Sequence, residues 1–558
     1  MIRSAAKILL IFLGSLIFSC AVKERPPGGP EDKTPPSILS VEPEPGSALI
    51  PLDTKFVITF SKTMNQTKTE NAVFLSPVFW QYPTMKWSGK KLIVIPPEDL
   101  DSNQTYVLTV GADAEGYRPN KIGKSFSFAF STGPKIDSCS ISGVIYLPEG
   151  AKFYDIWAYP VEDTPNFSFV REIPDFATQI DSAGKFSIEY MNPGNYLVVA
   201  VDDRNDDLFW EPGSEPIGLP PFILPLSDGE SFGGLALRPD RRDTLAASIS
   251  RARVVDNRRI DVEFTQPVSG EKYLKPEFYK ATSLDDAASL EIEGAYLGEK
   301  GQFVLETSPQ IDRVEYRLYA SGIISDWGVS FDTAGAGFEG TALADTARPR
   351  IISTYPGNRS SNVYQDSVVE LTFTERIRVH GFPEAVSVIA DSVDTLMFTP
   401  DWIAPNKARL VFPGRLPRLI KIEVFIDPGR ILDLVGNTAP DSMFSFSFRL
   451  PPADTIGIVT ARTEPGHRIV GLLAPLRTDA FSYISKSDKN GLISFETVLP
   501  GSYRFEYFED LDDDGRWSSG AVDPFKPCER FSFLPDSVSV RSRWTTDLGR
   551  VDLPRIGR

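Results

Sequence analysis

Short runs in which apolar residues alternate with polar or smaller ones recur along the whole chain, and long amphipathic helical windows are scarce. Phe56, Ile58 and Phe60 fall on one face of such a run, and three phenylalanines of the run 126–131 alternate with serine and alanine. Successive side chains of a strand point to opposite faces, so this spacing lets one face be buried. Pro, Gly, Asn and Asp separate the runs, and 558 residues exceed what one core accommodates. The pattern predicts an all-β protein, a tandem array of β-sandwiches forming an extended rod.

Two segments, 35–134 and 347–450, repeat one another. Pro36, Pro43 and Phe60 recur as Pro349, Pro356 and Phe373 at a constant offset, and the alternating phenylalanines of 126–130 recur at 444–448. The motifs in these segments are a Pro-Pro-x-Ile opening at 35–38, an Ile-x-Phe-Ser strand at 58–61 followed by Met64, and an Asp-x-x-Gly-Asn turn at 433–437. They resemble the bacterial Ig-like module of surface-layer and other envelope proteins, which implies a β-sandwich and no reaction.

The segment 243–346 is predicted to be a third, degenerate Ig-like copy. Residues 260–264 alternate in the same way, and Asp326-Trp327-Gly328 is interpreted as a version of the same turn.

A different repeat fills the remaining segments, 137–240 and 453–555. Nine residues of the first recur 307 positions later without a gap: Asp181, Gly184, Pro193, Gly194, Tyr196, Asp203, Asp207, Trp210 and Gly213. The pattern Asp-x-x-Gly followed by Pro-Gly-x-Tyr resembles the prealbumin-like or carboxypeptidase-regulatory-like β-sandwich. The resemblance implies that the Pro-Gly turn joins two strands and that the Tyr begins the second one.

The pattern at the N-terminus predicts an export signal. Arg3 and Lys7 precede the uncharged run 8–18, and Ser19 and Cys20 follow it. The run is too short to span a bilayer, which takes about 20 residues. The segment 16–20 resembles the lipobox of bacterial lipoproteins of the Bacteroidetes type. The resemblance implies a signal peptide over 1–19, a lipid with palmitate-type acyl chains on Cys20, and an outer-membrane protein on the periplasmic or the exposed face. The alternative is an ordinary signal peptide with a chance cysteine. Residues 20–34, rich in Pro, Gly and charge, are predicted to be a flexible tether.

The net charge and the cysteine content limit the classes of binding partner. The chain has 58 Lys and Arg against 75 Asp and Glu, a formal charge of −17, and such a surface repels nucleic acid. Besides Cys20 there are only Cys139 and Cys528, which are expected to be buried free thiols. The predicted partners are the membrane, through the lipid, and envelope proteins or glycans.

Each prealbumin-like copy follows its Tyr strand with an acidic loop, and both loops are candidate calcium sites. Oxygen-bearing side chains stand at positions 1, 3 and 5 of a calcium loop, where a hard cation finds several oxygens. Gly515 occupies the sharp turn of the second loop, whereas the first has Leu208 there. The glutamate expected at position 12 is absent, and Glu211 and Glu215, or Asp523, are candidate substitutes. The alternative is a solvated acidic turn stabilised by its own hydrogen bonds. The predicted ligands are Asp203, Asn205 and Asp207, and Asp510, Asp512 and Asp514.

Catalytic motifs are missing from the sequence. The two histidines, His380 and His467, lie in different repeats without a paired nucleophile and are expected on the surface or in loops. Tryptophans near turns (Trp80, Trp87, Trp210 and Trp517) could bind sugar rings, but Trp210 and Trp517 are expected to pack under the acidic loops. The chain is therefore predicted to be a non-catalytic envelope lipoprotein, a structural, scaffold or protein-interaction module. The alternatives are a carbohydrate-binding or adhesion lipoprotein and, third, a hydrolase with an unrecognised site.

Overall fold

The computed structural model describes residues 32–554, apart from short segments. The predicted signal peptide, Cys20 and most of the tether lie outside the described residues. The described chain is built of strands, with two short helices, α2 (Gln66–Glu70) and α3 (Phe382–Ala385), so the predicted all-β class is confirmed. None of its described helices is long and apolar enough to cross a membrane. The internal segments not described are 147–153, 163–166, 243–246, 270, 285–288, 328, 332–334, 362, 364–367, 441–443 and 478–481.

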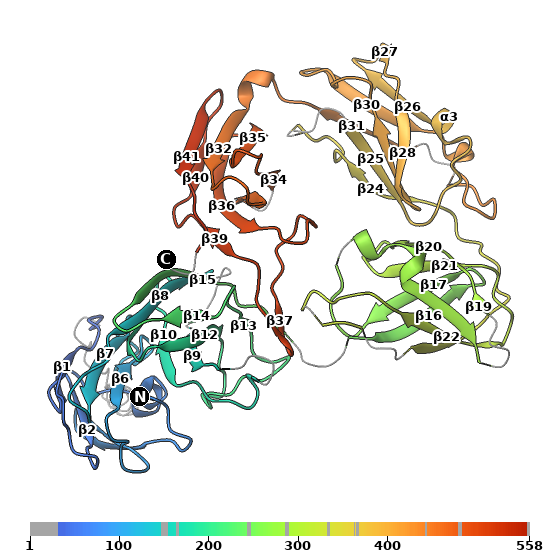
Figure 1. The fold of residues 1–558 in the computed structure, drawn as a ribbon. Coiled ribbons are helices and arrows are strands. Elements are labelled where there is room, and N and C mark those ends of the chain that lie inside the picture. The colour runs from blue at the N-terminus through green and yellow to red at the C-terminus, as the bar shows by residue number, and fades with distance from the viewer. Residues whose placement is uncertain are drawn as a thin grey trace, which may run out of the picture.

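Five β-sandwiches follow one another along the chain (Figure 1), and we number them 1 to 5. Sandwich 1 comprises β1 (Ile38–Glu42), β2 (Phe56–Phe60), β3 (Val73–Ser76), β4 (Thr84–Ser88), β5 (Lys91–Ile95), β6 (Thr105–Val110) and β7 (Phe126–Ser131). Its sheets have the strand orders β1-β2-β5-β4 and β3-β6-β7. The alternation predicted for β2 is present, because Phe56, Ile58 and Phe60 are fully buried between the two sheets while the residues between them are partly exposed.

Sandwiches 3 and 4 share one strand order. Sandwich 3 has sheets β16-β17-β21-β20 and β19-β18-β22-β23, and sandwich 4 has β24-β25-β29-β28 and β27-β26-β30-β31. The strands of sandwich 3 are β16 (Ile249–Asp256), β17 (Arg259–Phe264), β18 (Tyr279–Ser283), β19 (Ser289–Leu290), β20 (Ile292–Leu297), β21 (Phe303–Thr307), β22 (Glu315–Ala320) and β23 (Ala336–Glu339). Those of sandwich 4 are β24 (Ile351–Tyr355), β25 (Val368–Phe373), β26 (Val386–Ala390), β27 (Asp394–Thr395), β28 (Thr399–Ala404), β29 (Lys407–Val411), β30 (Lys421–Ile426) and β31 (Phe444–Arg449).

One tight turn recurs in sandwiches 1, 3 and 4. The backbone N–H of Asp433 donates to the carbonyl of Asn437 at 3.1 Å. The N–H groups of Ser325 and Gly116 likewise donate to the carbonyl of the residue four positions later in the chain. The segment 326–327 therefore does lie in a version of this turn, although its sequence has lost the Asp-x-x-Gly-Asn motif.

Sandwiches 2 and 5 share the other strand order. Their sheets are β10-β9-β12-β13 with β11-β8-β15, and β34-β33-β36-β39 with β35-β32-β41. The strands of sandwich 2 are β8 (Cys139–Ile145), β9 (Asp155–Pro160), β10 (Phe176–Gln179), β11 (Lys185–Met191), β12 (Gly194–Val201), β13 (Ile217–Gly218), β14 (Leu224–Leu226) and β15 (Ser231–Leu237). Those of sandwich 5 are β32 (Gly457–Arg462), β33 (Ile469–Pro475), β34 (Tyr483–Lys486), β35 (Leu492–Val498), β36 (Gly501–Glu509), β37 (Ala521–Val522), β38 (Phe525–Lys526), β39 (Phe531–Phe533), β40 (Val538–Val540) and β41 (Thr545–Arg550).

The Pro-Gly turns of these two sandwiches join strands as the sequence predicts. β12 and β36 begin at the glycine of each turn. The Tyr196 hydroxyl donates to the Asn192 carbonyl at 3.0 Å, and the Tyr503 hydroxyl donates to the Leu499 carbonyl at 2.7 Å. The repeated tyrosine thus closes the turn that precedes its own strand.

The expectation of an extended rod is wrong. Figure 1 shows sandwich 5 lying beside sandwich 2, with sandwiches 3 and 4 on the other side of sandwich 5. The contact is apolar, because Ala236 of sandwich 2 is buried in one cluster with Val470, Phe508 and Phe531 of sandwich 5. These side chains lie on outer faces that single sandwiches would leave in water, and covering them stabilises a closed arrangement.

Candidate functional site

The two acidic loops have the same backbone shape. Asp206 and Asp513 have φ of +58° and +60°, and two residues later Leu208 and Gly515 have φ of +63° and +75°. The left-handed region costs a side-chain-bearing residue roughly 1–2 kcal/mol. Leu208 adopts it nonetheless, so the lack of a glycine does not change the path of the first loop.

The second loop gathers three carboxylates. One ligand oxygen from each of Asp510, Asp512 and Asp514 lies within 4.8 Å of the others. The N–H of Gly515 donates to Oδ2 of Asp510 at 3.0 Å, which closes the loop on one side of that carboxylate. The structure thus brings together the three residues that the sequence predicts as ligands.

The first loop satisfies its polar groups internally. The Asn205 side-chain amide donates to Asp207 at 2.9 Å and to Glu211 at 3.2 Å, and the N–H of Leu208 donates to Asp203 at 3.0 Å. Burial, with repulsion from neighbouring carboxylates, raises the pKa of Asp203 to about 7. This arrangement matches the self-bonded acidic turn, the alternative to a metal site.

A buried glutamate accepts hydrogen bonds from the backbone of each acidic loop. The sequence repeat did not show that these two glutamates are equivalent. Glu529 accepts from the N–H of Leu511 at 2.7 Å and of Ser518 at 2.8 Å. Glu215 makes the matching pair of bonds in the first loop. Burial raises the pKa of Glu529 to about 7. The hairpin β37–β38 precedes Glu529 and shifts it from the constant offset of the repeat, which hid the match.

The candidate substitutes for the missing calcium glutamate lie in different places. Glu211 lies beside the first loop, where it accepts from the Asn205 amide at 3.2 Å. Both side-chain oxygens of Glu215 accept backbone N–H groups. Asp523 lies exposed on the hairpin β37–β38. Asp523 is also outside the carboxylate group of the second loop.

The tryptophans of the two loops pack beneath them, as predicted. The indole N–H of Trp210 donates to the Glu215 carbonyl at 2.8 Å, and that of Trp517 donates to the Glu529 carbonyl at 2.9 Å. Trp87 stacks on Phe60 in the core of sandwich 1. Trp80 is 74% exposed, but its ring stands at 80° to its neighbour Phe209, so these two rings form no flat platform.

The junction between sandwiches 2 and 5 is built around a buried cation. The Arg242 side chain is inaccessible to solvent and donates to the carbonyls of Gly520 at 3.0 Å and Ser519 at 2.7 Å. Desolvation lowers the pKa of Arg242 to about 10, against the attraction of Asp240. The Arg242 guanidinium is therefore hydrogen-bonded to the segment that leads into the hairpin β37–β38.

A second arginine of sandwich 2 lies among aromatic rings at the same junction. The Arg238 guanidinium is 4.7 Å from the ring centre of Tyr146, 5.2 Å from Trp517 and 5.7 Å from Phe531. The Tyr146 hydroxyl donates to Glu506 of sandwich 5 at 2.7 Å. Such cation–π contacts and the charged hydrogen bond strengthen the apolar contact.

The two described cysteines are buried free thiols, as predicted. The Cys139 thiol donates to the Ser227 carbonyl at 3.1 Å, and the Cys528 thiol donates to the Leu219 carbonyl at 3.3 Å. Burial raises the pKa of Cys528 to about 12, which keeps this thiol protonated and unreactive.

The two histidines have the surface positions expected of them. His380 is exposed, and the half-exposed His467 contacts Glu509 through Nδ1 at 2.8 Å. Arg530 also donates to Glu509 at 2.8 Å, so Glu509 joins the two side chains on sandwich 5.

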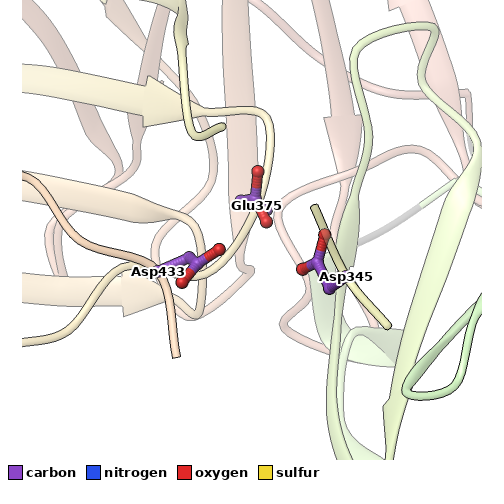
Figure 2. A group of neighbouring side chains, drawn as sticks. All are labelled: Asp345, Glu375 and Asp433. Atoms are coloured by element: carbon purple, nitrogen blue, oxygen red, sulfur yellow. The ribbon is translucent and has the colours of Figure 1, made fainter. Parts of the chain in front are cut away.

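A third carboxylate group lies between sandwiches 3 and 4. Figure 2 shows Asp345, Glu375 and Asp433 facing one another. Arg259 of β17 donates to Asp345 and to Glu375, each at 2.9 Å. Asp433 accepts from the N–H of Asn437 at 2.8 Å within the recurring turn. The sequence showed no motif for this group, because its members come from separate elements and meet only when the two sandwiches pack.

We expect this junction to weaken as the pH rises. Burial raises the pKa of Glu375 from 4.5 to about 8, with Arg259 lowering it and Asp345 raising it. Between these values the folded chain holds more protons than the unfolded chain, so stability falls with increasing pH. Thermal unfolding from pH 5 to 8.5 should show a falling midpoint, and Glu375→Gln should flatten that slope. An equal slope in both proteins would contradict the assignment.

Comparisons with known proteins agree with the fold. A family model described as a bacterial Ig-like domain matches residues 32–132 and 345–449, which lie in sandwiches 1 and 4. No curated protein matches the chain. The described strands and the family match together show tandem Ig-like β-sandwiches.

Solved structures resemble the chain only weakly. The N-terminal part of the bacterial S-layer protein SbsC is 13% identical, with 37% of this chain and 44% of that chain covered and a TM-score of 0.17. The major pilin subunit BcpA of Bacillus cereus is 11% identical over 52% and 97%, with a TM-score of 0.13. An L,D-transpeptidase from Mycobacterium smegmatis is 12% identical over 37% and 91%, with a TM-score of 0.15. This chain thus spans less than half of the S-layer fragment. Residues 32–132 and 345–449 of this chain match the bacterial Ig-like domain family.

Proposed function

We propose that the chain is a non-catalytic cell-envelope lipoprotein, held to the outer membrane through Cys20 and acting as a structural scaffold or protein-interaction module. The observation that carries this proposal is the buried junction between sandwiches 2 and 5, centred on Arg242. A junction of this kind fixes distant parts of the chain in one arrangement. A fixed body presents constant surfaces, which suits a spacer or docking platform.

The contact between sandwiches 1 and 2 supports the same view. Phe74 of sandwich 1 is buried in a cluster with Trp157 of sandwich 2. The N–H of Asp113 donates to the Gln179 side chain at 3.0 Å, and Ser125 donates to the Gln179 carbonyl at 2.8 Å. The sandwich nearest the proposed anchor is therefore firmly joined to the one that receives sandwich 5.

Replacing Cys20 with alanine should move the protein from the membrane fraction to the soluble fraction, because the acyl chains would be lost. Fractionation of cells, with mass spectrometry of the N-terminal peptide, measures both location and lipid. Cys139→Ala is the matched control and should stay with the membrane, since that thiol is buried. A Cys20→Ala protein that still pellets with membranes would refute the anchor.

A further inference from the structure

The carboxylates of the second acidic loop are gathered on one side of a sharp turn. Asp510, Asp512 and Asp514 place ligand oxygens within 4.8 Å of one another. Gly515, at a φ of +75°, turns the chain so that its N–H reaches Oδ2 of Asp510. Three carboxylates held this close repel one another unless a positive charge lies between them.

One oxygen of this group lacks a partner. Asp510 is only 1% exposed, and its Oδ2 accepts from Gly515 and, at 3.3 Å, from Lys486. Its Oδ1 is buried and has no hydrogen-bond donor among the residues that the structure describes. A buried carboxylate oxygen without a partner is destabilising. A metal ion bound by the loop would supply the missing contact.

Two lysines lie beside the group, but neither completes it. Lys272 of sandwich 3 donates to Oδ2 of Asp514 at 3.2 Å, and Lys486 donates to Asp513 at 2.8 Å. Both lysine side chains are about half exposed, so each ion pair is weak and the lysine can be displaced. Asp512 and Asp514 also line a cavity of about 790 Å³ between sandwiches 2, 3 and 5, which gives water access to the ion.

We propose that the loop 510–515 binds one calcium ion through Asp510, Asp512 and Asp514, and that Lys272 competes with the ion for Asp514. Calcium takes 6–8 oxygens in flexible geometry, so three carboxylates plus water suit it better than they suit magnesium. Binding loosens the contact of sandwich 3 with sandwich 5 at Lys272. The proposal goes beyond the scaffold function and is independent of the lipid anchor.

Calorimetric titration of the purified full chain with calcium chloride tests the site. We expect one site with a dissociation constant of roughly 10⁻⁴–10⁻³ M, as in extracellular modules. Asp510→Asn and Asp512→Asn should each weaken binding by about tenfold or more, since each removes a charged ligand. Asp203→Asn, the matched change in the first loop, should leave binding within about twofold of wild type.

The Lys272→Met variant tests the competition. Removing an exposed ammonium from Asp514 should tighten calcium binding about two- to fivefold, the effect of one exposed ion pair. Unchanged or weaker binding would overturn the competition and leave the site itself standing. Wild-type affinity in both Asp510→Asn and Asp512→Asn, equal losses in Asp203→Asn, or equal affinity for magnesium chloride would overturn the calcium site. Asp512 is exposed, so its variant reports on binding even if the Asp510 variant misfolds.

Discussion

Replacing Arg259 with methionine should destabilise the junction of sandwiches 3 and 4 by about 3–5 kcal/mol, the cost of removing one partner from a buried ion pair. The Arg259 side chain is 14% exposed and serves three carboxylates: Asp256 at 2.6 Å, and Asp345 and Glu375 at 2.9 Å. Methionine fills the space of the stem but leaves the charges of Asp256 and Asp345 uncompensated in a poorly hydrated place. Urea unfolding, with hydrogen exchange of the amides of β17 and β25, measures the loss.

Arg313→Met is the matched control, since that side chain is 85% exposed beside Asp312. It should change stability by less than about 0.5 kcal/mol. Adding Asp256→Asn to the Arg259 variant should recover part of the loss, because it removes one uncompensated buried charge. The same loss in the Arg259 and Arg313 variants, or no recovery from Asp256→Asn, would show that the carboxylates do not depend on Arg259.

The internal repeats allowed the fold of the single sandwiches to be predicted from the sequence. A constant offset aligns Pro36 with Pro349 and Phe60 with Phe373, and the structure gives both segments the strand order of an Ig-like sandwich. Alternation needs only local information, since the identity of residues two apart decides which face is buried. Sandwich 3, the degenerate copy, keeps the alternating apolar residues in β17 and the backbone hydrogen bond of the turn. Its turn residues differ from the Asp-x-x-Gly-Asn motif, so the alternation identified this copy where the motif could not.

The arrangement of the sandwiches could not be predicted in this way. Arg242 looks like an ordinary charged residue in the sequence, yet it is fully buried by partners about 280 positions away. Its carbonyl partners, Ser519 and Gly520, carry no side-chain signal, because any residue offers a carbonyl. The aromatic residues around Arg238 are likewise common core residues until the packing places them at a junction.

The two acidic loops differ in the structure although the same pattern of alternate oxygens predicts a metal site in both. Asn205 carries an amide that donates to Asp207, whereas Asp512 at the matching place has only oxygens. Oδ1 of Asp203 accepts from the Asp207 N–H at 3.4 Å, whereas Oδ1 of Asp510 has no donor among the described residues, so the second loop is the one left with an unpartnered carboxylate oxygen.

Replacing Arg242 with alanine should loosen sandwich 5 from sandwich 2 by about 3–6 kcal/mol. Each charged hydrogen bond contributes about 1.5–3 kcal/mol, and the change removes the donors to Gly520 and Ser519. The hairpin β37–β38 should respond first, because both carbonyls lie at its entrance. Hydrogen exchange across residues 517–530 should accelerate, and small-angle X-ray scattering should show a larger radius of gyration.

Arg241→Ala is the neighbouring control, since Arg241 is exposed while Arg242 is buried. It should leave both the exchange rates and the scattering unchanged. Arg242→Lys should fall between wild type and alanine, because an ammonium keeps the charge but loses the forked geometry that reaches two carbonyls at once. If the hairpin exchanged equally fast in the Arg241 and Arg242 variants, the apolar contact around Phe531 alone would account for the closed arrangement, and the rigid scaffold would have to rest on that cluster.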